Sequence, residues 1–468
     1  MLQRLILVAV VCLSGGALAK PPAGGVFCAT YPSAPVCTGQ QPACTYCHIA
    51  PPQRNAYGAS VEARLAPGVP RPLSDSEYSA ALPAALKAVE GADADGDGFS
   101  NLREILGGTL PADATSMPAE TGGCVAGTNS QYDVCHYDFR FAYRRVLLDF
   151  CGQSPTYAQL QSFTALGDDA RRAFLDTELD RCTTTEFWRG KNGQLWKLAH
   201  PKVRPVGSLK KGEDAGAIPL ADYYDDYSLY TYAQLDDHDA REVMTAKYFV
   251  SRQTNPTRYS VQTSLPSQFV DEVHRAGNLT SAWSLTYFVM FTALPRNAAS
   301  QSYRAYLGLD IAKQQGLFSV PGEPRDYDAK GVQAAACAAC HATLDPLSYP
   351  FRNYNGIVGT TISPRYMPNR LEQYFSNVSP TITQTPEAGY LFGQPVRDVV
   401  EWARVGADSD AFAVAAVTDY WKLLVGHAPT AEENAEFVST WQRFKGIHQC
   451  RIQRMLHDLI RTEAYGAP

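Results

Sequence analysis

The sequence lacks the features that several large protein classes require. After residue 19 no stretch approaches twenty uninterrupted apolar residues, so we expect no membrane span and a soluble mature chain. No long basic run is present and the formal net charge is -6, so nucleic acid is not an expected partner. No Ser-His-Asp arrangement or nucleotide-binding motif supports a hydrolase or a dehydrogenase. Strand-like alternation is scarce, which predicts a mainly α fold.

The N-terminal segment, residues 1–19, has the pattern of a secretory signal peptide. Arg4 precedes an apolar run from Leu5 to Leu13, and Ala17 and Ala19 form a small-residue cleavage site. This apolar run is too short to span a membrane. We therefore expect a periplasmic or otherwise secreted protein.

Two five-residue motifs, CTYCH at 44–48 and CAACH at 337–341, share the pattern C-x-x-C-H. Two thiols three positions apart lie on one face of a helical turn, where both can form thioethers with the vinyl groups of one porphyrin. The histidine that follows is the proximal iron ligand. The pattern predicts two c-type haems, held by Cys44, Cys47 and His48 and by Cys337, Cys340 and His341. The alternatives are a redox pair, which expects a surrounding βαβ pattern, and half of a zinc site, which needs two further ligands.

The ligand on the far side of each iron decides the chemistry. Methionine there gives a closed haem that transfers electrons at raised potential, whereas an empty position binds small molecules or peroxide. The candidates are Met117 and Met367, the first methionines after each motif, with His136 and His200 as competitors. Carbonyl groups of the segments 51–52 and 345–346 are expected to orient the two proximal imidazoles.

A twelve-residue loop from Asp93 to Glu104 matches the EF-hand calcium pattern. Oxygen-bearing side chains occupy positions 1, 3, 5 and 9, glycine occupies position 6, and glutamate occupies position 12. The expected calcium ligands are Asp93, Asp95, Asp97, the carbonyl of Phe99, Asn101 and Glu104. No second loop pairs with it, so we expect a structural calcium site; the alternative is an acidic turn without metal.

The chain has twelve cysteines, and seven lie outside the signal peptide and both motifs. Neighbours in sequence suggest three disulfides, Cys28–Cys37, Cys124–Cys135 and Cys151–Cys182. Connectivity does not follow from sequence, so the leftover Cys450 is either a free buried thiol or displaces one of these partners.

Apolar residues recur at three- and four-residue intervals through much of the chain, which predicts helices. We expect them at 74–90, opened by a capping box of Ser74 and Glu77, and at 139–150, 155–166, 168–181, 186–199, 240–250, 281–294, 302–315, 409–425, 431–444 and 449–461. Residues 221–239 carry five tyrosines and six aspartates. They are expected to form a folded-back loop whose rings pack on the body, with a docking surface or electron-hopping route as alternatives.

From residue 138 onward the chain resembles the planctomycete-type cytochrome c proteins. The similar stretches are RRVLLDFCGQSPTYAQLQSF at 144–163, DAREVMTAKYFV at 239–250, CAACHATLDPLSYPFRNYNGIVG at 337–359 and FAVAAVTDYWKLLVGHAPTAEENAEF at 412–437. The segments 347–349 and 352–355 depart from the family's usual G-F and E-N-F-D. The resemblance transfers only the second haem motif, because the family's modules are mostly domains of unknown function. Separately, the N-terminal haem and calcium segment resembles modules of secreted bacterial proteins.

These patterns predict two c-type haem modules joined by a helical middle region. The expected parts are the signal peptide at 1–19, a cytochrome c-like module with the calcium loop at 20–120, a helical middle domain at 121–325, and a second haem module with C-terminal helices at 326–468. The expected function is electron transfer by a dihaem c-type cytochrome to or from a redox partner protein. The alternatives are a dihaem peroxidase-like oxidoreductase with one open iron, and a calcium-stabilised, haem-bearing scaffold for a redox enzyme.

Overall fold

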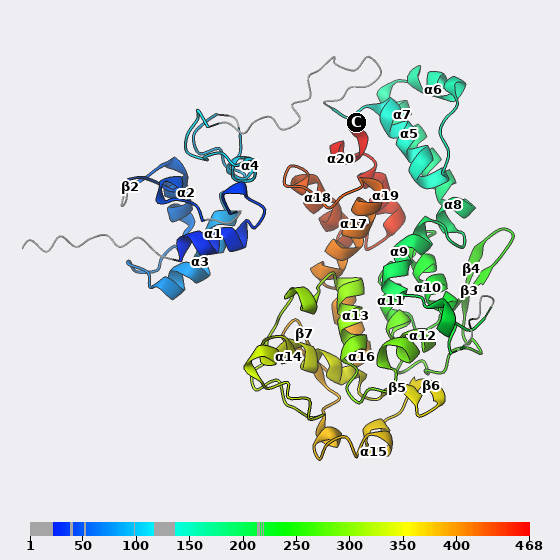
Figure 1. Ribbon diagram of the computed structural model, residues 1–468. Coiled ribbons are helices and arrows are strands. Elements are labelled where there is room, and N and C mark those ends of the chain that lie inside the picture. The colour runs from blue at the N-terminus through cyan, green and yellow to red at the C-terminus, as the bar shows by residue number, and fades with distance from the viewer. Residues whose placement is uncertain are drawn as a thin grey trace, which may run out of the picture. The chain divides into compact units, whose positions relative to one another are not determined.

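The computed structural model describes residues 22–37, 41–50, 53–97, 99–116, 136–212, 216, 218 and 220–468. The expected signal peptide, Met117 and the pair Cys124–Cys135 lie outside these residues. The fold is mainly helical, as the sequence predicts (Figure 1). Among the described residues, no helix combines the length and the apolar character needed to cross a membrane.

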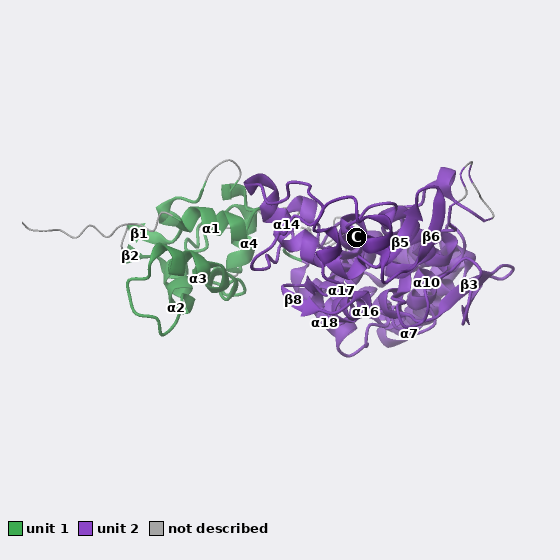
Figure 2. Cartoon of the chain, turned by 90° about the horizontal axis from the view of Figure 1, so that it is seen from below, with its two compact units in different colours: residues 1–124, 430–432 green, residues 125–429, 433–468 purple. Residues whose placement is uncertain are grey.

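The chain divides into two compact units (Figure 2). Unit 1 comprises Met1–Cys124 with Thr430–Glu432, and unit 2 comprises Val125–Pro429 with Glu433–Pro468. The helical middle region and the second C-x-x-C-H segment therefore belong to the same unit. They also share one hydrophobic core, whose buried residues run from Ala142 to Tyr465.

Unit 1 packs short helices around a core of aromatic and aliphatic side chains. Its elements are α1 (Ala23–Thr30), η1 (Pro35–Cys37), η2 (Cys44–Tyr46), β1 (His48–Ala50), β2 (Gln53–Arg54), α2 (Ala56–Arg64), α3 (Asp75–Lys87) and α4 (Asn101–Gly107). The predicted capping box is confirmed, because Ser74 accepts the Glu77 N–H while the Glu77 carboxylate accepts the Ser74 N–H. The core includes Phe27, Tyr46 and Tyr57, whose rings meet edge to face.

Unit 2 is a larger helical body with three short β-hairpins among the described residues. Its α-helices are α5 (Phe139–Val146), α6 (Tyr157–Thr164), α7 (Asp168–Thr183), α8 (Glu186–Arg189), α9 (Gln194–Val203), α10 (Tyr224–Gln234), α11 (Glu242–Thr245), α12 (Ala282–Ser284), α13 (Arg296–Leu307), α14 (Ala335–Ser348), α15 (Arg370–Tyr374), α16 (Val399–Ala407), α17 (Asp410–Leu424), α18 (Asn434–Lys445), α19 (Ile452–Leu459) and α20 (Glu463–Gly466). Two π-helices, η3 (Leu147–Cys151) and η6 (Leu285–Val289), extend α5 and α12. The hairpins pair β3 (Phe249–Gln253) with β4 (Arg258–Gln262), β5 (Tyr354–Val358) with β6 (Thr361–Tyr366), and β7 (Gly389–Leu391) with β8 (Gln394–Val396).

Several helix predictions are wrong in extent. Over 240–250 only α11 is helical, because Phe249 already begins a strand that pairs with β4. The helix expected at 302–315 starts earlier, at Arg296, and stops at Gly308, whose φ of 68° breaks the helical path. Residues 221–239 are not a loop: they contain α10, most of whose side chains are buried. The sequence pattern does not indicate this helix, because its buried residues are mostly aromatic or polar rather than aliphatic.

Two of the three expected disulfides lie in the described residues, and both are confirmed. Cys28 bonds to Cys37 in unit 1, and Cys151 bonds to Cys182 in unit 2. Cys450 is a free and buried thiol, and burial raises its pKa to about 11.

Candidate functional site

The second C-x-x-C-H motif lies on α14, which packs beside α13 (Figure 1). Cys337 is exposed, while Cys340 and His341 are partly exposed, and neither cysteine is in a disulfide. The helical spacing of three and four places these side chains on neighbouring positions of one helix face. This face offers two free thiols and an imidazole to one ligand.

The imidazole of His341 forms a hydrogen bond with a carboxylate. Its Nδ1 lies 2.7 Å from Oδ1 of Asp345, one turn further along α14. The carboxylate only accepts, so Nδ1 carries the proton, and in the neutral imidazole Nε2 keeps the lone pair that a metal would bind. The expectation that a carbonyl of the 345–346 segment orients this imidazole is corrected, because the partner is the side chain of Asp345.

Arg296 joins Asp345 to a second buried acid. At the start of α13, it donates to both Asp345 oxygens at 2.6 and 2.9 Å and to both Asp328 oxygens at 2.6 and 3.0 Å. Asp345 is 0% exposed and Asp328 is 6% exposed. Burial alone would lower the pKa of Arg296, but hydrogen bonds to the two carboxylates raise it. The guanidinium is therefore a fixed positive charge between two anions.

Because of Pro346, one backbone carbonyl of α14 bonds to the segment that precedes the helix. Proline has no N–H, so the carbonyl of Ala342 loses its helical partner. That carbonyl instead accepts the N–H of Val320 at 3.1 Å. The residue after His341 is thereby anchored to the segment that precedes the helix.

The first motif has a different local structure. Cys44 begins the 3₁₀ turn η2, Cys47 follows it, and His48 begins the strand β1, so this motif does not lie on an α-helix. The amide of Asn55 donates to the carbonyls of Thr45 and Tyr46, both at 3.1 Å. Cys44 is exposed, Cys47 is partly exposed, and both are free.

The imidazole of His48 has one buried nitrogen without a partner. This atom, Nδ1, has no hydrogen-bond partner among the described residues. Such atoms are rare in folded proteins. The segment 51–52, which is expected to supply a carbonyl to this imidazole, lies outside the described residues.

Two observations bear on the alternative interpretations of C-x-x-C. Burial raises the pKa of Cys47, the second cysteine of the first motif, to about 11. A zinc site needs four clustered ligands. Within the described part of the chain, the one cluster of three or more His, Cys, Asp or Glu side chains that could share a metal is elsewhere, at Asp93, Asp95 and Asp97.

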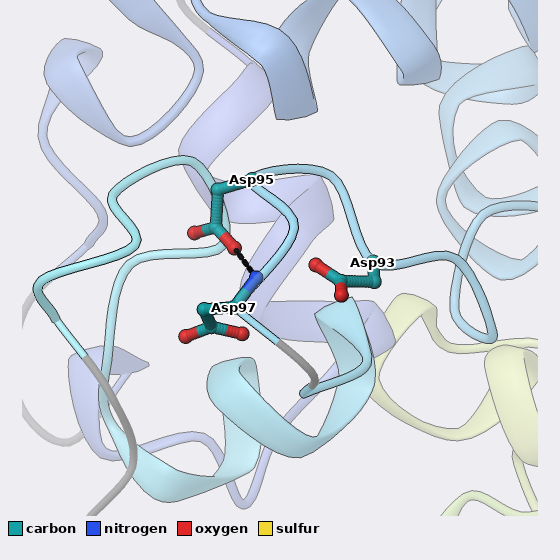
Figure 3. Close-up of side chains that lie close together, drawn as sticks. All are labelled: Asp93, Asp95 and Asp97. Carbon is teal, nitrogen blue, oxygen red and sulfur yellow. Dashed lines mark hydrogen bonds between the residues drawn. The ribbon is translucent and has the colours of Figure 1, made fainter.

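These three aspartates come together in the loop before α4, and ligand oxygens of all three lie within 4.8 Å of one another (Figure 3). Backbone amides shape the loop: Gly96 N–H donates to Asp93, Asp97 N–H to Asp95 and Phe99 N–H to Asp97. Gly96 has a φ of 80°, the left-handed conformation that the sharp turn requires. One oxygen of Asp95 and one of Asp97 are buried and have no hydrogen-bond partner in the residues that the structure describes.

Glu104 extends this acidic group from α4. Its side chain is 0% exposed, and neither carboxylate oxygen has a hydrogen-bond partner within the described part of the chain. Burial and the nearby charges of Asp95 and Asp97 raise its pKa to about 8. A buried carboxylate without a counter-charge is costly. The donor set is hard oxygen, as calcium prefers.

Asn101 has a structural role in this loop. It is 0% exposed, donates to the carbonyl of Val89 at 2.7 Å, and accepts from Ala94 N–H at 3.2 Å. Its amide thereby joins the end of α3 to the loop. This side chain is already engaged with backbone groups, unlike the carboxylate of Glu104.

Met367, the candidate far-side ligand of the second motif, follows β6, and its N–H donates to the carbonyl of Asn353. The β5–β6 hairpin packs on η6. His200 lies on α9, where its Nδ1 is 2.8 Å from the Tyr227 hydroxyl, and His136 is exposed.

No family model, curated protein or solved structure matches the chain. Function is therefore inferred from the residues themselves. Sequence patterns located both C-x-x-C-H motifs and the acidic loop. They missed Arg296 and Asp328, which reach the site only through the tertiary fold, although the spacing of four between His341 and Asp345 is a detectable signal.

Proposed function

We propose that the protein is a secreted dihaem c-type cytochrome that transfers electrons and is stabilised by calcium. The observation that carries the proposal is the arrangement on α14. Two free thiols and an imidazole share one accessible helix face, and the imidazole is held by a buried carboxylate through the nitrogen that would not bind iron.

The residues of each motif have distinct roles under this proposal. Cys337 and Cys340 hold one haem through thioethers and His341 binds its iron, while Cys44, Cys47 and His48 do the same in unit 1. When bound, haem supplies a reversible one-electron couple. The similarity of residues 337–359 to planctomycete-type cytochromes agrees with this assignment.

Calcium has a structural role in the proposal. Asp93, Asp95, Asp97 and Glu104 supply the carboxylates, and the buried, unpartnered oxygens of Glu104 support this assignment. A bound dication would compensate the charges of three clustered aspartates and the buried Glu104, which otherwise repel one another. The ion thus favours the folded form of unit 1.

A peroxidase-like oxidoreductase is the second candidate function. The observation that favours it is the carboxylate behind His341, because such a partner increases the basicity of the ligand. Carbon monoxide and peroxide distinguish the two functions. The visible spectrum of two closed low-spin irons should not change with either reagent, whereas that of an open iron should.

The decisive experiment counts covalent haem. The full chain is produced in a bacterial periplasm that attaches haem c, and pyridine haemochrome analysis should give two haems per chain. The paired variants C44A/C47A and C337A/C340A should each retain one haem, whereas the control C450A should retain two. A wild-type chain with one haem or none would refute the dihaem proposal.

A further inference from the structure

We propose that Asp345, which shares the guanidinium of Arg296 with Asp328, is a positioning residue that lowers the reduction potential of the haem attached at α14. The inference rests on the proposed function, because it requires haem at Cys337 and Cys340. It adds a property that the C-x-x-C-H pattern does not specify, namely how strongly the protein holds this iron in its oxidised form.

The first step is the strength of the contact. His341 Nδ1 and Asp345 Oδ1 are 2.7 Å apart, a short distance typical of a charge-assisted hydrogen bond. The carboxylate is 0% exposed, so water does not compete for it. In such surroundings the bond is electrostatically stronger than it would be at the surface.

The second step is the effect on the ligand. A carboxylate that accepts the Nδ1 proton fixes the ring and increases electron donation from Nε2. Stronger donation stabilises ferric iron more than ferrous iron, so the potential falls. Neutral backbone carbonyls, the partners expected at first, carry less negative charge.

The third step is the role of the other two residues. Arg296 alone would neutralise Asp345, because it donates to both of its oxygens. However, the same guanidinium also donates to both oxygens of Asp328. One positive charge is thus shared by two buried negative charges. The charge of Asp345 is therefore only partly compensated, and the remainder acts on His341.

The test uses the C44A/C47A chain, which carries only the haem at α14, and measures its midpoint potential by spectroelectrochemistry. In this background, D345N removes the charge but keeps the size of the side chain. D328N removes the competing carboxylate, so the charge of Arg296 compensates Asp345 alone. D326N is the matched control, because the Asp326 carboxylate accepts the backbone N–H groups of Lys330 and Gly331, whereas Arg296 donates to Asp345 and Asp328. Haem content is measured first in every variant.

D345N should raise the ferrous-to-ferric ratio at fixed potential at least tenfold, which corresponds to about 59 mV for a one-electron couple. D328N should raise it by a smaller factor, and D326N should leave it nearly unchanged. Equal shifts in all three would indicate a general loss of negative charge and overturn the inference, as would a haem-loaded D345N without a shift. If D345N does not fold, an unchanged potential in D328N overturns it. Absence of haem in the parent chain would instead refute the proposed function.

Discussion

Gly58 lies against the carbonyl oxygen of Cys47, so closely that a Cβ atom at this position would sit 1.9 Å from that oxygen. Gly58 belongs to α2, and Asn55 at the start of that helix also holds the backbone of η2. The first C-x-x-C-H turn is therefore shaped by the helix that follows it.

This contact predicts that Gly58→Ala destabilises unit 1. Alanine in a helix is ordinarily favoured over glycine by roughly 0.5–1 kcal/mol. Here the added methyl group meets backbone, which cannot move aside as a flexible side chain would, so calorimetry of the full chain should show a lower melting temperature. Gly91→Ala is the control, because nothing lies within 4 Å of its Cβ position. Equal melting temperatures for G58A and wild type would contradict the geometry.

The second prediction concerns Glu104 and calcium. Glu104→Gln replaces a buried carboxylate by a neutral amide, so the loop should lose calcium-dependent stabilisation. At calcium 100-fold above the dissociation constant, binding to the folded state alone stabilises by about 2.7 kcal/mol. Melting curves with calcium and with chelator should differ for wild type and coincide for E104Q. The control D113N changes an exposed acid outside the twelve-residue loop and should respond to chelator as wild type does. Indifference of wild type to chelator would remove the calcium assignment.

The third prediction is a pH dependence of the calcium-free protein. The pKa of Glu104 is raised to about 8, well above its usual value of 4.5. Between these values the folded state holds a proton that the unfolded state has released, so stability must fall as the pH rises from about 5 to about 8. Calcium should abolish this fall by replacing the proton. Melting temperatures over this range, with chelator and with calcium, provide the measurement, and E104Q should show a smaller slope.

Local patterns predicted what depends on neighbours in sequence. The capping box of Ser74 and Glu77 and the aspartate spacing of the acidic loop were predicted because each involves residues within one or two turns. The helix at 139–150 was also predicted, and it continues as a π-helix to Cys151.

Tertiary relationships could not be predicted in this way. Arg296 and Asp345 are 49 positions apart, and neither position has a pattern that indicates the other. The 3₁₀ turn at Cys44 depends on Asn55 and Gly58, which are contacts made after folding. For the same reason the pairing of β3 with β4 displaced an expected helix, since strand pairing competes with local helical preference.

The fourth prediction concerns the buried thiol of Cys450. It is 2% exposed, and burial raises its pKa to about 11, so little thiolate exists at neutral pH. A maleimide reagent should therefore leave Cys450 unlabelled in the native, haem-loaded protein and modify it in urea. Peptide mapping identifies the site, and C450S supplies the unlabelled reference. Rapid labelling at this position without denaturant would contradict the observed burial.

The fifth prediction tests Arg296 as the counter-charge of two buried acids. Arg296→Gln removes the positive charge between Asp345 and Asp328, so that Asp345 keeps only its contact with His341; breaking a buried ion pair typically costs about 3–5 kcal/mol. Arg296→Lys keeps the charge but cannot donate to four oxygens at once, so its loss should be smaller. Urea unfolding of the haem-loaded chain measures both. Arg325→Gln, at an exposed arginine near Glu323, is the control and should change stability little. If R296Q were as stable as R325Q, the guanidinium would not stabilise the two buried carboxylates. The inference that Asp345 and Asp328 share its charge would then be contradicted as well.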